Sequence, residues 1–164
     1  MNIFITGNPR CGKSTIIQKL LAQISGKRVS GFITPEIRVE GMREGFKIID
    51  LYSGEGEILA SLNIKRGPGV ARYKVNVAGI DKIMDKFLES FEDSDYAVID
   101  EIGMMEFYSA KFRQVVTMVL NSDKTVVATL SKKFVKQYIN KGQIYYLTRD
   151  NFEEIFNKVL SQIR

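Results

Sequence analysis

The sequence predicts an α/β fold in which a mostly parallel central sheet is flanked by helices. Three segments carry apolar residues at helical spacing, and short apolar runs rich in β-branched and aromatic residues alternate with them. Strand and helix in alternation imply right-handed crossovers between parallel strands. With 164 residues, 45 % of them hydrophobic, the chain suits a single domain, 1–164, with a sizeable core.

The helical segments are defined by apolar stripes. In the clearest one, apolar residues recur at intervals of three and four while charged residues occupy the other positions. It comprises Ile80, Ile83, Met84, Phe87, Leu88 and Phe91. Similar stripes predict helices over Phe112–Val119 and Phe152–Ile163.

The strand segments are short and lack a clean polar–apolar alternation, which is typical of strands buried on both faces of a sheet. They are Ile3–Ile5, Tyr96–Ile99, Thr125–Leu130 and Ile144–Leu147.

A glycine-rich region, 27–77, interrupts this alternation. Extended pieces at 29–34 and 45–50 flank turn signals at Glu40-Gly41 and Ser53-Gly54, so we predict an antiparallel hairpin elaboration around 29–52. The segment Ile64–Ala71, which contains Gly67-Pro68-Gly69, is predicted to be a loop.

The residue counts exclude several kinds of chemistry. The chain has no histidine, which rules out Ser-His-Asp triads, Cys-His proteases and His-ligated metals. Its single cysteine, Cys11, cannot form an intrachain disulfide. Catalysis is left to carboxylates, lysines, backbone amides and bound metal.

The N-terminus has no basic region before its short apolar run, and no stretch reaches the roughly 20 apolar residues of a membrane helix. We therefore expect a cytoplasmic protein without membrane contact. The net charge of +5 fits a lysine-rich surface better than a nucleic-acid partner.

The strongest motif is G-x-x-x-x-G-K-S, which lies between the predicted strand Ile3–Ile5 and a helix that we predict to open over Thr15–Leu21. Glycines at both ends let successive backbone N–H groups point at a polyphosphate, and the following helix N-terminus adds positive partial charge. Lys13 is expected to reach the β- and γ-phosphates as a catalytic residue, and Ser14 to bind Mg²⁺. The predicted nucleotide-binding residues here are Gly7, Asn8, Pro9, Arg10, Cys11, Gly12, Lys13, Ser14 and Thr15.

A second motif ends the predicted strand at Tyr96–Ile99 with Asp100 and Glu101. In open α/β sheets, ligands bind at the carboxyl ends of the strands, so we predict Asp100 as a metal residue and Glu101 as the base that activates water. Ile102 and Gly103 complete the predicted nucleotide-binding set. Together with Asp100 and Glu101 they form a D-x-x-G motif, which also occurs in small GTPases. No Asn-Lys-x-Asp motif, which would recognise guanine, occurs in the chain, and this disfavours a GTPase.

Taken together, these motifs resemble the small P-loop nucleoside triphosphatases first described from thermophiles and related to the human cancer-related nucleoside triphosphatase. The resemblance covers almost the whole chain. It is carried by the phosphate loop, Gly31-Phe32-x-Thr34-x-Glu36-x-Arg38, Gly41-x-Arg43-x-Gly45-Phe46, Tyr73–Val77, Asp100–Glu106 and Ala128-Thr129-Leu130. It implies a RecA-like fold and Mg²⁺-dependent hydrolysis of several nucleoside triphosphates with loose base preference.

Phosphoryl transfer needs positive charge beyond Lys13 and Mg²⁺. The candidate transition-state arginines are Arg38 and Arg43, with Arg10 in the phosphate loop as a third.

We therefore predict Mg²⁺-dependent hydrolysis of nucleoside 5′-triphosphates to diphosphate and phosphate, with no obligate protein partner. Two alternatives stay open. One is a nucleotide or small-molecule kinase, with Lys65–Arg72 as a lid over the phosphates. The other is a nucleotide-dependent module that binds RNA or DNA through Lys132, Lys133 and Lys136.

Overall fold

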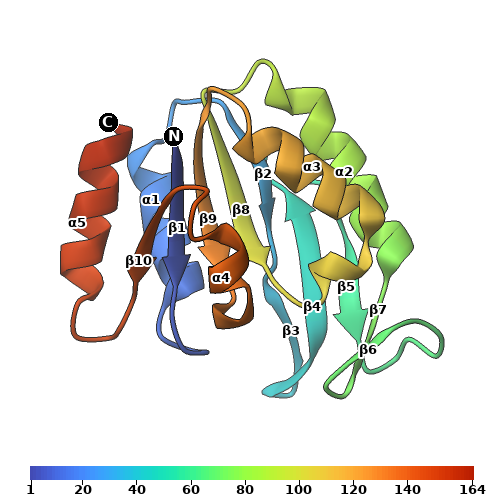
Figure 1. Ribbon diagram of the computed structural model, residues 1–164. Helices are drawn as coiled ribbons and strands as arrows, with labels where there is room; N and C mark the ends of the chain where they lie inside the picture. The colour runs from blue at the N-terminus through green and yellow to red at the C-terminus, as the bar shows by residue number, and fades with distance from the viewer.

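In the computed structural model, which describes residues 1–164, the chain forms one mixed sheet with helices on both faces (Figure 1). The sheet order is β10-β1-β9-β8-β2-β4-β5-β7-β6, and β3 pairs with β4. The strands are β1 (Asn2–Thr6), β2 (Val29–Ile33), β3 (Glu36–Val39), β4 (Met42–Asp50), β5 (Gly56–Ser61), β6 (Gly69–Val70), β7 (Tyr73–Val75), β8 (Tyr96–Ile102), β9 (Thr125–Leu130) and β10 (Gln143–Tyr146).

The five strands β10, β1, β9, β8 and β2 are parallel to one another. Their carboxyl ends meet at one edge of the sheet, the lower edge in Figure 1. The predicted fold class, an α/β architecture with a parallel central sheet flanked by helices, is confirmed.

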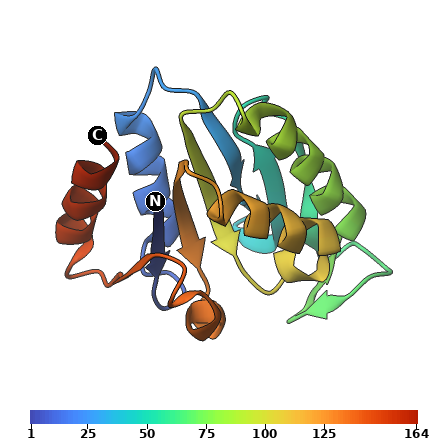
Figure 2. The same ribbon diagram turned by 45° about the horizontal axis from the view of Figure 1, so that its top comes forward.

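The helices cover both faces of this sheet. They are α1 (Lys13–Gln23), α2 (Val77–Phe91), α3 (Ala110–Leu120), α4 (Val135–Tyr138) and α5 (Phe152–Ile163), with short 3₁₀ turns η1 (Glu106–Tyr108) and η2 (Lys132–Phe134). Figure 2 shows α1 and α5 together on one side of the sheet, and α2 and α3 together on the other. None of these helices combines the length and the apolar composition that crossing a membrane requires.

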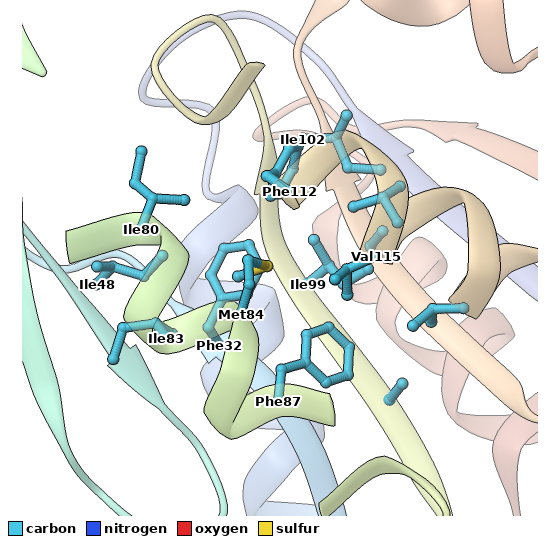
Figure 3. Packing of buried hydrophobic residues seen from close by; sticks show 14 of the residues in the cluster. Phe32, Ile48, Ile80, Ile83, Met84, Phe87, Ile99, Ile102, Phe112 and Val115 are labelled. Carbon is cyan, nitrogen blue, oxygen red and sulfur yellow. The ribbon is translucent and has the colours of Figure 1, made fainter. Parts of the chain in front are cut away.

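Two apolar cores lie between the helices and the sheet. Successive residues of β1 point to opposite faces, so Phe4 joins the core under α2 and α3 while Ile3 and Ile5 join the core under α1 and α5. In the larger core, Phe32 of β2 packs edge-on against Phe87 and Phe112 (Figure 3), with ring centroids 6.4 and 6.0 Å apart. Both helical stripes predicted there therefore face the sheet, except for Leu88 of the first stripe, which is 37 % exposed.

Polar caps fix where two of these helices begin. The side chain of Asn76 accepts a hydrogen bond from the backbone N–H of Gly79, and that of Ser109 accepts one from Phe112. Such caps satisfy N–H groups that have no partner within the helix. Helix α2 consequently begins at Val77, three residues before the first residue of the predicted stripe.

The other half of the sheet, which we call the antiparallel arm, consists of β3 to β7. The predicted turns at Glu40-Gly41 and Ser53-Gly54 are both present. Two details differ from the prediction: β2 also pairs in parallel with β8, and the arm continues to Val75. Within the predicted loop 64–71, Gly69–Val70 forms β6 against β7, because a two-residue strand owes its conformation to its neighbour and carries no periodic pattern.

Candidate active site

A cavity of about 830 Å³ opens at the carboxyl edge of the parallel strands, next to the antiparallel arm. Residues from both halves of the sheet line it. They are Gly7, Pro9, Arg10, Gly12, Lys13, Ser14, Thr15, Thr34, Glu36, Arg43, Phe46, Asp100, Glu101, Ser131, Lys132 and Lys133.

One wall of the cavity is the loop between β1 and α1. Gly12 is the N-cap residue of α1 with φ of 106°, a left-handed conformation that glycine adopts without strain. No side chain caps this helix and its first turn holds no acidic residue, so its free N–H groups and its positive partial charge face the cavity. This arrangement suits an anion such as a phosphate group.

Lys13 supplies a full positive charge at the same place. Its Nζ donates a hydrogen bond to the carbonyl oxygen of Gly7 at 2.9 Å. The ammonium therefore lies over the loop whose amides face the cavity.

Asp100 is a buried residue near the carboxyl end of β8 and is held by two hydroxyl groups. Ser14 Oγ donates to Asp100 Oδ2 at 3.1 Å, and Thr129 Oγ1 donates to Oδ1 at 2.7 Å. Burial raises the pKa of the Asp100 carboxyl, while these two hydrogen bonds and the charge of Lys13 oppose the rise. The result is a hydroxyl and a carboxylate side by side at the floor of the cavity.

Glu101 follows in β8 and lines the cavity beside Lys13. Burial raises the pKa of its carboxyl, with a further rise from the charge of Asp100 and an opposing effect from Lys13. The backbone just before Glu101 is held by the residue that follows β2, because Thr34 Oγ1 donates to the backbone carbonyl of Asp100 at 2.9 Å.

A third carboxyl, Glu106, lies behind Glu101 and is only 3 % exposed. A Cβ atom placed on Gly103 would lie 2.8 Å from Glu101 Oε1 and 3.0 Å from Glu106 Oε2, so these two side chains approach the same point. Burial and the charges of Glu101 and Asp100 hold the pKa of Glu106 well above its usual range, against hydrogen bonds from backbone N–H groups.

The two candidate arginines of the arm have different surroundings. Arg43 lines the cavity, where its Nε donates to the Tyr73 hydroxyl at 2.9 Å and its Nη1 to Glu36 Oε1 at 3.3 Å. Arg38 does not line the cavity. Its guanidinium donates to Glu36 and to the carbonyl oxygen of Gly41, both at 2.9 Å.

The family of the chain follows from comparison with known proteins. Residues 2–160 match a family model described as NTPase. Among curated relatives, nucleoside-triphosphatase THEP1 of Methanocaldococcus jannaschii is 42 % identical, with 100 % of each chain covered. The THEP1 protein of Pyrococcus abyssi is 38 % identical, over 100 % of this chain and 93 % of its own. The chain belongs to this NTPase family.

Two solved structures agree with the assignment. The crystal structure of THEP1 from the hyperthermophile Aquifex aeolicus has a TM-score of 0.87 at 32 % identity and covers 100 % of this chain and 99 % of its own. The solution structure of a human cancer-related nucleoside triphosphatase has a TM-score of 0.81 at 27 % identity and covers 99 % and 97 %. The predicted resemblance and the prediction of a nucleoside-triphosphatase enzyme are both confirmed.

Nine of the nucleotide-binding residues predicted for this NTPase line the cavity, and four do not. Asn8 is exposed and accepts a hydrogen bond from Lys132, while Cys11 packs against the core under α1. Ile102 is fully buried in the opposite core, and Gly103 separates Glu101 from Glu106. Ile102 and Gly103 therefore shape the end of β8 and do not line the cavity.

Sequence reasoning missed several lining residues of this NTPase. They are Thr34 and Phe46 from the arm side, and Ser131, Lys132 and Lys133 after β9. Lys132 Nζ donates to Asn8 Oδ1 at 2.9 Å and joins this loop to the phosphate loop. Thr34 and Ser131 directly follow the parallel strands β2 and β9, and ligand sites in open α/β sheets lie just beyond such strands. That rule would have found them.

Proposed function

We propose that this NTPase hydrolyses nucleoside 5′-triphosphates to nucleoside diphosphate and phosphate with Mg²⁺ and with loose base preference. The observation that carries the proposal is the Ser14–Asp100 hydrogen bond, which joins the phosphate loop to β8 beside Glu101 in one cavity. The residues that we propose for phosphate binding, for the divalent ion and for the base are thereby adjacent.

The phosphate loop binds the triphosphate. The free N–H groups at the start of α1 donate hydrogen bonds to phosphate oxygens, and Lys13 adds its charge where the β- and γ-phosphates would lie. Preorganised donors of this kind stabilise the charge of the transferring phosphoryl group without reorganisation.

The donor set at Ser14 and Asp100 fits Mg²⁺, which prefers oxygen ligands and is usually held by one or two carboxylates together with substrate phosphates and waters. Ser14 and Asp100 would hold the ion together with oxygens of the bound triphosphate and water, since no group of three or more acidic, cysteine or histidine side chains is present. When bound there, Mg²⁺ would supply positive charge that neutralises the phosphate oxygens.

Glu101 is assigned as the base by comparison with the other carboxylates of the cavity. Asp100 already accepts hydrogen bonds from Ser14 and Thr129. Glu36 is paired with Arg38 and Arg43. Burial alone would raise its pKa, but these hydrogen bonds outweigh burial and lower it. Glu101 accepts no such hydrogen bond, and its raised pKa suits proton abstraction from water.

Loose base preference is supported by the lining of the cavity, which includes one hydrophobic residue, Phe46. A site that reads a base surrounds it with apolar and aromatic side chains and a few fixed polar groups. The Arg43 guanidinium already lies over the Phe46 ring at 5.2 Å. The base is therefore left largely uncontacted.

The kinase alternative has no support. The relatives above are named as nucleoside-triphosphatases, and no residue of the predicted lid 65–72 lines the cavity. Arg72, the last of them, donates instead to the Tyr73 hydroxyl and to the carbonyl oxygen of Arg43.

The test is phosphate release from ATP, GTP, CTP and UTP, measured with Mg²⁺ and with EDTA. We expect turnover of all four with Mg²⁺, kcat/KM values within about tenfold of one another, and loss of turnover in EDTA, since a tenfold rate difference is only ~1.4 kcal/mol of barrier. Phosphate transfer only in the presence of an added nucleoside monophosphate or other acceptor would contradict the hydrolase assignment.

A further inference from the structure

We propose that Arg43, carried in cis by the antiparallel arm, is the arginine that stabilises the γ-phosphoryl group in the transition state, and that Tyr73 positions it. This inference rests on the proposed function, because it assigns a residue to that reaction.

Arg43 has the position and the free donors that the role requires. It lines the cavity from β4 in the antiparallel arm, whereas the phosphate loop follows β1 in the parallel half of the sheet. Hydrogen bonds engage its Nε and Nη1, whereas Nη2 makes none. A guanidinium presents five N–H donors in a planar fork that matches phosphate oxygens, so Arg43, which lines the cavity, retains free donors at Nη2.

The side chain of Arg43 is held by two aromatic rings. Its Cζ lies 5.2 Å from the centroid of Phe46 and 5.7 Å from that of Tyr73, within the range of cation–π attraction. These two rings pack edge-on against each other with centroids 5.4 Å apart. The hydrogen bond to Glu36 fixes a further edge of the guanidinium. Such preorganisation removes much of the entropy cost of fixing a long side chain on a ligand.

Tyr73 in turn is fixed by a second arginine. Its ring is 3 % exposed, and its hydroxyl oxygen accepts hydrogen bonds from Arg43 Nε and from Arg72 at Nε and Nη2, 3.3 and 3.2 Å away. Arg72 Nη2 also donates to the backbone carbonyl of Arg43 at 3.0 Å. Arg72, in the turn before β7, thereby holds the side chain of Arg43 through Tyr73 and its backbone directly.

The other two candidate arginines lack this combination. Arg38 is directed to Glu36 and Gly41 outside the cavity. Arg10 lines the cavity, but its exposed side chain makes no hydrogen bond or ion pair that would hold it in place. Both would have to be reoriented or ordered before acting on a phosphoryl group.

Delivery in cis has a kinetic consequence. Arginines that act on phosphoryl transfer come either from the same chain or from a second protein. With Arg43 on its own arm, the chain needs no partner to complete the site, so specific activity should not depend on protein concentration.

The decisive experiment compares Arg43→Ala with Arg38→Ala, which removes the neighbouring arginine on β3. We expect Arg43→Ala to lower kcat by about a hundredfold or more, the effect of losing a transition-state donor, with KM within about threefold of wild type. Arg38→Ala should keep kcat within about threefold of wild type, since it removes no such donor.

Chemical rescue separates catalysis from folding. Guanidinium chloride at millimolar concentrations should restore part of the kcat of Arg43→Ala, because the free cation can occupy the vacated place, and should restore none in Lys13→Ala.

Tyr73→Phe keeps the ring and removes the hydroxyl, so it should lower kcat by about tenfold with little change in KM, a loss of ~1.4 kcal/mol in transition-state binding.

The outcomes are distinguishable. Equal kcat for both arginine variants, or an Arg43→Ala loss that guanidinium does not restore, overturns the role of Arg43 and leaves the hydrolase assignment intact. Specific activity that rises with wild-type concentration overturns the cis delivery. A wild-type protein that releases no phosphate from any of the four nucleotides overturns both proposals.

Discussion

Ser14 Oγ donates a hydrogen bond to Asp100 Oδ2 at 3.1 Å, joining two residues that are 86 positions apart in the sequence. Ser14 comes from the first turn of α1 and Asp100 from the end of β8. The contact exists because β1 and β8 both neighbour β9 in parallel, which brings their carboxyl ends to the same edge of the sheet.

Asp100→Asn tests the divalent-ion site at this contact. The amide keeps the size of the side chain but removes the charge that attracts a cation, so we expect kcat at saturating nucleotide to fall by about a hundredfold and the Mg²⁺ concentration for half-maximal rate to rise. Titration of Mg²⁺ at fixed ATP measures both. The exposed Asp123→Asn is the matched control, and a wild-type Mg²⁺ profile in Asp100→Asn would be incompatible with the assignment.

Glu101→Gln tests the base. The amide retains the shape of Glu101 but cannot take a proton from water, so kcat should fall by about 10²- to 10⁴-fold while nucleotide affinity stays near that of wild type. Single-turnover phosphate release and binding of a non-hydrolysable triphosphate measure the two quantities. Glu92→Gln, on the exposed end of α2, serves as the control, and unimpaired turnover in folded Glu101→Gln would eliminate Glu101 as the base.

Thr34 is expected to act through the backbone of β8, because its hydroxyl holds the carbonyl oxygen of Asp100 just before Glu101. Thr34→Val removes the hydroxyl at nearly constant volume and should lower kcat by about tenfold, since small displacements of a catalytic group are costly. Thr34→Ser keeps the donor and should recover most of the rate. Identical kinetics of the valine and serine variants would show that the hydrogen bond has no catalytic role.

Glu106→Gln is expected to stabilise the protein in a pH-dependent way. The carboxyl of Glu106 has an ordinary pKa of 4.5, and burial with the nearby charges of Glu101 and Asp100 raises it well above that value in the folded state. Below the ordinary pKa the side chain is neutral in both states. As pH rises from there toward the folded-state pKa, the wild type loses stability because only the unfolded chain ionises freely.

The glutamine variant cannot ionise, so its advantage in urea unfolding should be near zero at pH 4 and grow toward neutral pH. Glu153→Gln at the exposed start of α5 provides the comparison. An advantage that stays constant with pH would mean that the charge of Glu106 is not buried as described.

Gly31→Ala tests the close approach of the two parallel strands β2 and β8. A Cβ at Gly31 would lie 1.8 Å from the carbonyl oxygen of Val98, whereas a Cβ at Gly54 meets nothing within 4 Å, and both glycines have positive φ, 113° and 75°. Gly54→Ala should therefore cost about 1–2 kcal/mol of unfolding free energy from backbone strain alone. Gly31→Ala should lose the same strain energy and a further 1–3 kcal/mol or more, roughly, of unfolding free energy from the steric clash with Val98. Equal losses would contradict the close approach of β2 and β8.

The helices and parallel strands were predictable because their signals are local. Apolar residues at helical spacing over Ile80–Phe91 and Phe152–Ile163 match α2 and α5 within a few residues. The two-residue strand β6 was not predictable, since Gly69–Val70 is extended only because β7 lies beside it. The residues of β2 likewise do not indicate that this strand pairs in parallel with β8 and antiparallel with β4.

The sequence by itself determined the phosphate loop, its lysine and serine, and the acidic end of β8, because each is a contiguous stretch whose conformation depends on its own glycines, caps and apolar run. Only the tertiary structure decided between Arg38 and Arg43. The two face each other in the β3–β4 ladder and both contact Glu36, so spacing alone treats them alike. What separates them is the packing of Tyr73 and Phe46 around Arg43, and these side chains meet only when β7 and β4 join the same sheet.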